Sequence, residues 1–564
     1  MRDKAITRRF FCFLTTAIIL LLAPVAQAKI LIDFGNNVSY RSASTGNPDV
    51  NGNYWNSVDS SKYWSNLLNA DNSSSLIGFG FSSAPGADSY NGPAGATTGS
   101  NNVANVVINV TALGDFGVYP AAFDYYVSST FTIQQLNSAK VYDLTFFGSH
   151  KYNDDNTTVY TVYTANDYAT AVASASLLVG VGSAHNQDKV VTISNVAPQT
   201  SNSIWIGFKG SAGNNGYLNA MRINEITPDG TWNGGGANSD TMTDANWTNG
   251  RYPAAVASGV MRFAGSTRTS PIVNYSAGSA FGSIYFNSGA AAFTVGGNAL
   301  TLKSLIENDS ASAQTINNNL TMGAAISLKS TVAGGSLTLG GTLNTGSGGY
   351  TLTADNAYDI AIDGAISGNG SILKSSAGTL ILSVANTYSG ATTVNAGTLR
   401  VNGSLAAGSA VAVNFGGTLG GSGTVGGATT VNAGGALDPG TTSIGTLTTA
   451  NLTLNNDSEI ICKITTPDCD TVQVAGNLSL PSAAGEATTI VIPAGSTLAP
   501  NTTYPVVNYT GSLSGNKIAV VNDASELGVT ANIDTGNKKI LVQTAPEPGL
   551  FTLAGLLLLA LRKS

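Results

Sequence analysis

Residues 394–399 read Val394-Asn395-Ala396-Gly397-Thr398-Leu399, and the same pattern returns twice further along the chain. It recurs as Val-Asn-Phe-Gly-Gly-Thr-Leu from Val413 and as Val-Asn-Ala-Gly-Gly-Ala-Leu from Val431, at spacings of 19 and 18 residues. A period of this length, with short apolar stretches between Gly and Asn, is typical of one coil of a solenoid. We therefore expect residues 228–460 to form a right-handed parallel β-helix with Gly or Asn at bends of positive φ.

The repeat also predicts which side chains stack from one coil to the next. Asn395, Asn414 and Asn432 occupy the same repeat position and should form a ladder of amide hydrogen bonds. Leu399, Leu419 and Leu437 should lie above one another in an apolar column inside the coils. Roughly nine coils at a strand spacing of ~4.8 Å predict a rod on the order of 40 Å long.

The stretch around the first repeat carries a more specific pattern. Residues 378–403 contain Gly-Thr-Leu-Ile-Leu, then Asn-Thr-Tyr-Ser-Gly, then Thr-Thr-Val-Asn-Ala-Gly-Thr-Leu. This order closely resembles the autotransporter-associated β-strand repeat, and Asp244-Ala245-Asn246-Trp247 looks like the lead-in of such proteins. The resemblance implies a β-helical passenger stalk and does not imply an enzyme.

Residues 29–227 are rich in aromatic residues and short apolar runs, which predict an all-β sandwich. The opening Ile-Asp-Phe-Gly at 32–35 and the closing Tyr-Leu-Asn-Ala at 217–220 are similar to galactose-binding-like jelly rolls. Many members of that fold bind glycans, whereas others only pack against neighbours. The candidate glycan contacts are Trp55, Trp64, Trp205, Asn153 and Asp154, although each tryptophan also fits a core position. Asp154 and Asp155 also suit either a calcium loop or a solvated turn.

Residues 461–544 continue with alternating strands and regain charged residues, so we expect a C-terminal β cap that ends the stacking of coils. Cys462 and Cys469 lie between two of these strands. An exported protein meets an oxidising compartment, and the pair is predicted to form a hairpin disulfide. A metal pair is the alternative, but no His lies nearby.

Both ends of the chain carry export signals. Residues 1–28 combine a basic start, an apolar stretch and Ala-Gln-Ala, which predicts cleavage between Ala28 and Lys29 after general secretory or twin-arginine export. Residues 545–564 combine Pro546, Glu547 and Pro548 with an apolar run at 550–561 and a basic end. This tail resembles the PEP-CTERM sorting signal of Gram-negative bacteria, with a transmembrane helix held transiently in the inner membrane. The resemblance implies an exosortase partner and delivery to the cell surface or extracellular matrix.

Composition argues against several other functions. Charged residues make up 10% of the chain and the net charge is −7, so nucleic acid is not an expected partner. Between residues 365 and 455 the charged residues are Lys374, Arg400 and Asp438, which cannot supply the paired carboxylates of a glycosidase. A polysaccharide-degrading β-helix enzyme and a Ser-His-Asp site around His150 or His185 remain the alternatives. We expect no catalytic residue, cofactor or metal, and a structural or adhesion protein that binds exopolysaccharide.

Overall fold

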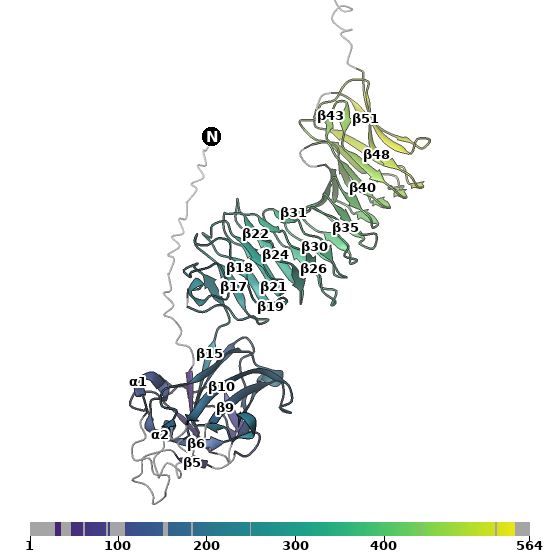
Figure 1. Ribbon diagram of the computed structural model, residues 1–564. Helices are drawn as coiled ribbons and strands as arrows, with labels where there is room; N and C mark the ends of the chain where they lie inside the picture. Colours follow the sequence, from purple (N-terminus) through teal and green to yellow (C-terminus); the bar gives the residue numbers. More distant parts are fainter. Residues whose placement is uncertain are drawn as a thin grey trace, which may run out of the picture. The chain divides into compact units, whose positions relative to one another are not determined.

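The computed structural model describes residues 29–34, 45, 47–59, 63–85, 88–90, 108–150, 156–181, 184–248, 250–440, 443–524 and 527–546. The chain divides into two compact units, residues 1–226 and 227–564 (Figure 1). Both are built almost entirely of strands, as the sequence predicts. The predicted signal peptide and the apolar part of the tail lie outside the described residues.

Unit 1 is a sandwich of two antiparallel-rich sheets. The first has the order β12 (Val191–Val196), β8 (Val141–Phe147), β15 (Ala220–Ile226), β1 (Lys29–Phe34) and β2 (Asn56–Val58). The second has the order β11 (Ala184–His185), β10 (Ala171–Val181), β9 (Asn156–Tyr163), β13 (Ile204–Gly210), β7 (Ser129–Gln134), β4 (Gly78–Phe81) and β3 (Tyr63–Trp64). Phe34 from the first sheet packs between the sheets against Phe79 and Phe131 from the second. The predicted sandwich is therefore confirmed.

Smaller elements complete unit 1. A three-stranded sheet joins β14 (Tyr217–Leu218), β6 (Asp124–Val127) and β5 (Asp88–Tyr90), and two short helices, α1 (Val110–Leu113) and α2 (Tyr119–Phe123), lie between β5 and β6 in the chain. The opening strand β1 pairs antiparallel with the late strand β15, with Ile32 opposite Met221. The two motifs that resemble a galactose-binding-like domain thus meet where Asp33 is opposite Ala220, whereas Tyr217 and Leu218 belong to the three-stranded sheet.

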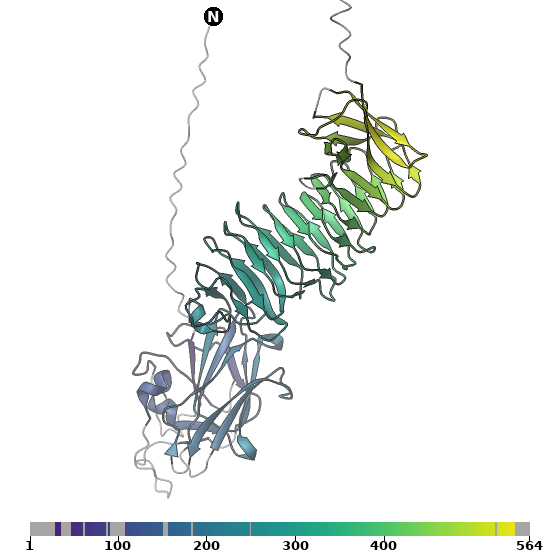
Figure 2. The ribbon, with the colours of Figure 1, turned by 45° about the horizontal axis from the view of Figure 1, so that its top comes forward.

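Unit 2 is a parallel β-solenoid, as the repeat predicts, and successive strands stack along it (Figures 1 and 2). A 16-stranded sheet begins with β16 (Gly230–Trp232) and ends with β49 (Leu513–Ser514). A 12-stranded sheet runs from β18 (Ile272–Val273) to β50 (Ile518–Asn522). The expectation of nine coils is therefore too low. It was based on residues up to 460, whereas parallel pairing continues beyond them through β47 (Thr488–Ile492).

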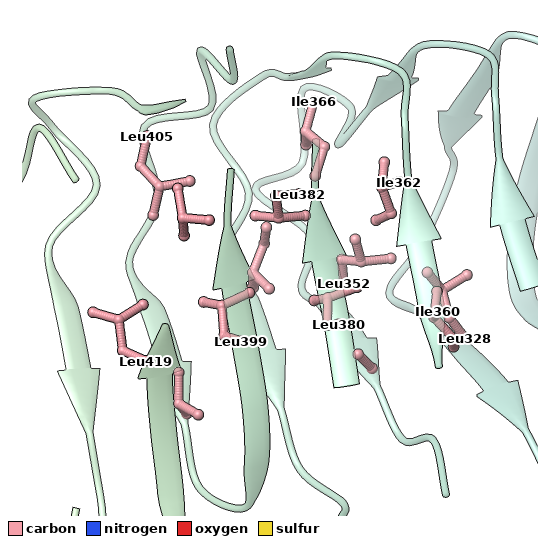
Figure 3. Close-up of a cluster of buried hydrophobic side chains, with 14 of the residues drawn as sticks. Leu328, Leu352, Ile360, Ile362, Ile366, Leu380, Leu382, Leu399, Leu405 and Leu419 are labelled. Carbon is pink, nitrogen blue, oxygen red and sulfur yellow. The ribbon is translucent and has the colours of Figure 1, made fainter. Parts of the chain in front are cut away.

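The interior of the solenoid is filled by apolar columns. Leu380 in β31 (Thr379–Leu382), Leu399 in β33 (Gly397–Val401) and Leu419 in β36 (Gly417–Gly421) are in register on consecutive coils. Leu437 in β39 (Ala436–Pro439) continues the column, and all four leucines are fully buried. Figure 3 shows this packing of aliphatic side chains between the sheets. The predicted leucine column is confirmed.

Both ends of the solenoid are closed by different means. At the first coil, Trp232 and Trp247 are buried edge to face at 5.3 Å and pack against Phe263. At the other end, β48 (Thr503–Tyr509) pairs parallel with β45 (Thr471–Val474) but antiparallel with β52 (Lys539–Thr544). Strand β51 (Val529–Asp534) then pairs antiparallel with β52. This reversal of direction ends the parallel stacking and caps the solenoid. The cap is shorter than the predicted 461–544, because parallel pairing continues through β49 and β50.

Candidate functional site

Trp55 does not offer a surface to a ligand. Its side chain is 2% exposed and packs against Phe116. Its indole Nε1 donates to Asp49 Oδ2 at 2.7 Å, and its backbone N–H donates to Asn47 Oδ1. A buried tryptophan with a satisfied N–H is a core residue. The expectation that Trp55 contacts a glycan is therefore wrong, because it packs inside the sandwich.

Trp64 and Trp205 lie on opposite faces of the seven-stranded sheet. Trp64 packs against Phe79 on the inner face, at a ring distance of 6.1 Å. On β13, Ile204 and Ile206 are buried, so the alternation of a strand turns Trp205 outward, where it is half-buried. Of the three predicted tryptophans, Trp205 is the one placed on an outer face.

Strand register places other aromatic side chains beside Trp205. Trp205 is opposite Tyr163 of β9 on one side and Thr132 of β7 on the other. Thr132 is opposite Gly80 of β4, which in turn is opposite Tyr63 of β3. At a strand spacing of ~4.8 Å, Trp205 and Tyr63 are about 14 Å apart across the sheet. We call Tyr63, Tyr163, Tyr168 and Trp205 the outer-face aromatic row.

Glycines beneath the row let its rings lie on the sheet. A Cβ atom on Gly78 would be 2.3 Å from Tyr63 Oη, and one on Gly80 would be 2.8 Å from Tyr63 Cδ2. A Cβ on Gly207 would be 3.1 Å from Tyr163 Cε2. Glycine within a strand commonly marks such a close approach. These glycines hold the tyrosine rings against the backbone, where Tyr63 remains 50% exposed.

Tyr168 reaches the row from the turn between β9 and β10. Its ring packs edge to face on Tyr163 at 5.4 Å, and its hydroxyl donates to Ser82 Oγ at 2.5 Å. Partial burial raises the pKa of Tyr168 above its usual value, so the hydroxyl stays protonated. The hydrogen bond fixes the ring across the neighbouring strands.

A buried hydroxyl lies within the row. Thr132 is 8% exposed, and among the described residues its Oγ1 has no hydrogen-bond partner. Its oxygen is covered by neighbouring side chains, so the hydroxyl is not itself open to a ligand on the outer face. Aromatic rings on a flat surface, with hydroxyl groups between them, can stack on the apolar faces of sugar rings and bond their hydroxyls.

The other predicted polar residues give no comparable site. Asn153 and Asp154 lie outside the described residues. A shallow cleft at the edge of the sandwich is lined by Leu178, Gly180 and residues 185–189. His150 is buried, and its ring stacks on Tyr217 at 4.0 Å. Within the described ranges, no group of three or more His, Cys, Asp or Glu side chains gathers as metal ligands do.

Cys462 and Cys469 lie close together beside the short hairpin of β43 (Ile464–Thr465) and β44 (Asp468–Cys469). Both are thiols in the structure, and Cys462 is fully buried. The hydrogen bond with Cys469 and burial raise the pKa of the Cys462 thiol. The disulfide between them stays a prediction. Two thiols this close can be joined by an oxidant without a change of the fold.

Between residues 365 and 455 the charged side chains do not pair two carboxylates with each other, although Asp438 interacts with Asp470 of a later segment and burial raises the pKa of both carboxyls. Lys374 points inward and is fully buried. Arg400 and Asp438 point outward in one column of the 12-stranded sheet, with Gly420 between them. The opposite charges of Arg400 and Asp438 do not suit general acid and base catalysis at a glycosidic bond.

The export and sorting residues are largely beyond the structure. Lys29 begins β1 and Pro546 is exposed, whereas Ala28, Glu547 and Pro548 lie outside the described residues. Among the helices that the structure describes, none has the length and apolar character to cross a bilayer. The cleavage and sorting motifs therefore stay predictions.

Sequence reasoning missed the tyrosines of the row. Tyr163 ends a strand whose alternation could have placed it outward, and Gly78, Gly80 and Gly207 interrupt strands as glycines under aromatic rings do. The sequence did not show that Tyr63 and Trp205 share one face, because that depends on the pairing of distant strands.

Comparison with known proteins gives two matches. Residues 372–401 match the passenger-associated-transport-repeat family. They include β30 (Ile372–Lys374), β32 (Thr392–Val394) and β33, and the match supports the resemblance described above. A stretch of 118 residues is 37% identical to the adhesin BmaC autotransporter of Brucella suis biovar 1 (strain 1330). It covers 19% of this chain and 3% of that adhesin, so the chain spans a small part of the relative's length.

Proposed function

We propose that this protein is an exported, surface- or matrix-associated adhesion protein that binds exopolysaccharide through the outer-face aromatic row. The observation that carries the proposal is the alignment of Trp205, Thr132 and Tyr63 on one outer face, with the Tyr63 ring lying over Gly78 and Gly80. The row spans about 14 Å, which is long enough for several sugar residues.

In this proposal the solenoid is a non-catalytic scaffold. Its interior is a continuous apolar core, and its repeat matches a family named for autotransporter passengers. The similarity to an adhesin over a short stretch supports a role in adhesion. Hydrolysis or lyase cleavage of the bound polysaccharide is the alternative that a binding experiment should also monitor.

Binding is tested by a glycan array with the purified exported chain, followed by affinity measurements on the best ligand. Trp205→Ala and Tyr63→Ala should each weaken binding roughly fivefold to tenfold, because each removes one stacking ring. Tyr119→Ala is the matched control, since Tyr119 is 43% exposed in the same unit but outside the row. Equal affinities for all variants, or release of new reducing ends or unsaturated products, would contradict the proposal.

We further propose that residues 545–564 are removed by an exosortase-type enzyme after transient insertion in the inner membrane. The support is the order of Pro546-Glu547-Pro548, an apolar run and a basic end. Mass spectrometry of cell-surface protein should find peptides up to about residue 545 and none from residues 551–564. Abundant surface protein that retains residues 556–562 would show that the tail is not processed.

A further inference from the structure

One outward column runs along a corner of the solenoid and changes its chemistry halfway. In the first half, Glu307 is in register with Lys329, whose Nζ lies 3.6 Å from Asp355 Oδ2. Asn395 follows β32 at the same position of a later coil, and the column then consists of asparagines. The column is thus charged at one end and neutral at the other.

The asparagines form a directional chain of hydrogen bonds. Asn414 Nδ2 donates to Asn395 Oδ1 at 2.7 Å, Asn432 Nδ2 to Asn414 Oδ1 at 2.7 Å, and Asn455 Nδ2 to Asn432 Oδ1 at 2.8 Å. An amide has two N–H donors and an oxygen with two lone pairs. Each internal rung therefore still has one N–H and one lone pair available to a ligand, repeated every ~4.8 Å.

The neighbouring outward column on the same sheet is also neutral. Thr393, Ala412, Thr430 and Thr453 are in register two residues before the four asparagines. Of the nearby charged residues, Lys374 points into the interior, and Arg400 and Asp438 belong to the other sheet. Asp457, two residues after Asn455, is exposed at the far end of the ladder, and its negative charge would also repel an anionic ligand. These two columns present hydroxyls and amides without a charge.

Phe415 stands beside this neutral surface. It is 80% exposed, whereas the equivalent residues on the flanking coils are Ala396 and Ala433. A Cβ on Gly434 would lie 2.3 Å from Phe415 Cδ2, so the ring rests on the glycine of the next coil. A single exposed apolar side chain is common on protein surfaces, so the informative feature of Phe415 is its fixed position over Gly434 beside the ladder. A ring held in this way, between alanines that leave room, has an open face for a ligand.

We propose that Phe415 and the Asn395–Asn414–Asn432–Asn455 ladder form a second binding site, specific for a neutral polysaccharide. One sugar stacks on Phe415, and neighbouring sugars along the column bond the free amide N–H groups and oxygens. A rigid ladder repeats its donors and acceptors as a polysaccharide repeats its hydroxyls. A single exposed ring is far too small for a stable contact with a second copy of the chain. The absence of charge on the two columns disfavours an anionic polymer.

The test uses the whole exported chain in affinity electrophoresis through gels that contain dextran, soluble starch or a soluble β-glucan, with alginate as the anionic comparison. Phe415→Ala introduces the residue that the chain itself has at positions 396 and 433, so the coil should fold unchanged. Tyr358→Ala is the control, because Tyr358 is an exposed aromatic of the solenoid away from the ladder. Trp205→Ala is combined with each variant to remove the proposed site of unit 1.

In the Trp205→Ala background, a neutral polysaccharide in the gel should still slow the migration of the protein. This retardation should fall roughly fivefold or more with Phe415→Ala and stay the same with Tyr358→Ala. Asn414→Ala should also weaken it. Loss of all retardation with Trp205→Ala alone would overturn the second site while supporting the first. Equal retardation with and without Phe415, or retardation by alginate alone, would overturn it as well. If only the Phe415 variant affects binding, the second site stands and the proposed site of unit 1 fails.

Discussion

The side-chain amide of Asn414 donates to the side-chain oxygen of Asn395 at 2.7 Å and so joins two consecutive coils at their outer corner. Two residues after each asparagine of the repeat, a glycine adopts positive φ: 64° at Gly397, 79° at Gly416 and 71° at Gly434. A glycine takes this conformation without the penalty of a Cβ. The repeated bend therefore places the asparagines of consecutive coils next to one another. The predicted ladder is confirmed, and Asn455 is a further member.

Asn414→Ala should destabilise unit 2 by about 1–3 kcal/mol, because it removes the bonds to both neighbouring asparagines. Asn414→Asp keeps the acceptor for Asn432 but places a carboxylate oxygen against Asn395 Oδ1, so its effect should be at least as large as that of Asn414→Ala. Urea unfolding followed by circular dichroism measures both. Unchanged stability in both variants would contradict the ladder as a stabilising feature.

Leu399→Asp should destabilise the solenoid by on the order of 3–5 kcal/mol, because it buries a carboxylate between Leu380 and Leu419 and removes apolar packing. The matched control is Thr398→Asp, one residue away on the outward side of the same strand. Thermal melting should show a large drop for Leu399→Asp and a small one for Thr398→Asp. Similar melting temperatures for the two variants would argue against the register.

Asp33 should make unit 1 less stable at neutral pH than in mild acid. Burial raises the pKa of its carboxyl from 3.8 to about 6, although Thr45 Oγ1 and Ser57 Oγ donate to it. Between these two pKa values the folded state binds more protons than the unfolded state. Stability therefore falls as the pH rises from about 4 to about 6 and is level above that.

Asp33→Asn removes the charge and retains an acceptor for both hydroxyls. It should stabilise unit 1 at pH 7 by up to about 3 kcal/mol, and the gain should shrink towards pH 4. Asp167→Asn, at an exposed turn, is the control for removal of a surface charge. Unfolding measured across this pH range provides the check. A gain from Asp33→Asn that does not change with pH would contradict the prediction.

Lys374 should make unit 2 more stable in alkaline solution than at neutral pH. The lysine is fully buried, its Nζ donates to the Ser376 carbonyl oxygen, and burial lowers its pKa from 10.5 to about 8. The folded state holds fewer protons than the unfolded state between these values. This group therefore adds stability as the pH rises from about 8 to about 10.5.

Lys374→Met should keep or raise the stability of unit 2 at pH 7, because an apolar chain fits beside Ala354 and Val394 in the interior. The increase in stability at alkaline pH should disappear in this variant. It should persist in the control Lys303→Met, which replaces an exposed lysine. Melting temperatures at pH 7, 8.5 and 10 distinguish the cases. A strong loss of stability at pH 7 would show that the ammonium's hydrogen bond outweighs its desolvation.

The solenoid could be predicted in detail because its information is local. A coil of 18 or 19 residues contains its own strands, its Asn corner and its glycine bend, and it pairs with the coils next to it in the chain. Register therefore follows from the repeat, which is why Leu399, Leu419 and Leu437 were placed correctly. Because the spacing is irregular before residue 378 and after residue 460, the predicted number of about nine coils was too low.

The sequence by itself determined the all-β class, the parallel solenoid, its amide ladder and its leucine column. Only the tertiary structure decided that Trp55 is a core residue, while Trp205 shares an outer face with Tyr63 and Tyr163. The strands of unit 1 pair across long separations, β1 with β15 and β13 with both β7 and β9. Alternation along one strand gives two possible faces, and only pairing with distant strands determines which face meets the core and which side chains gather on the other.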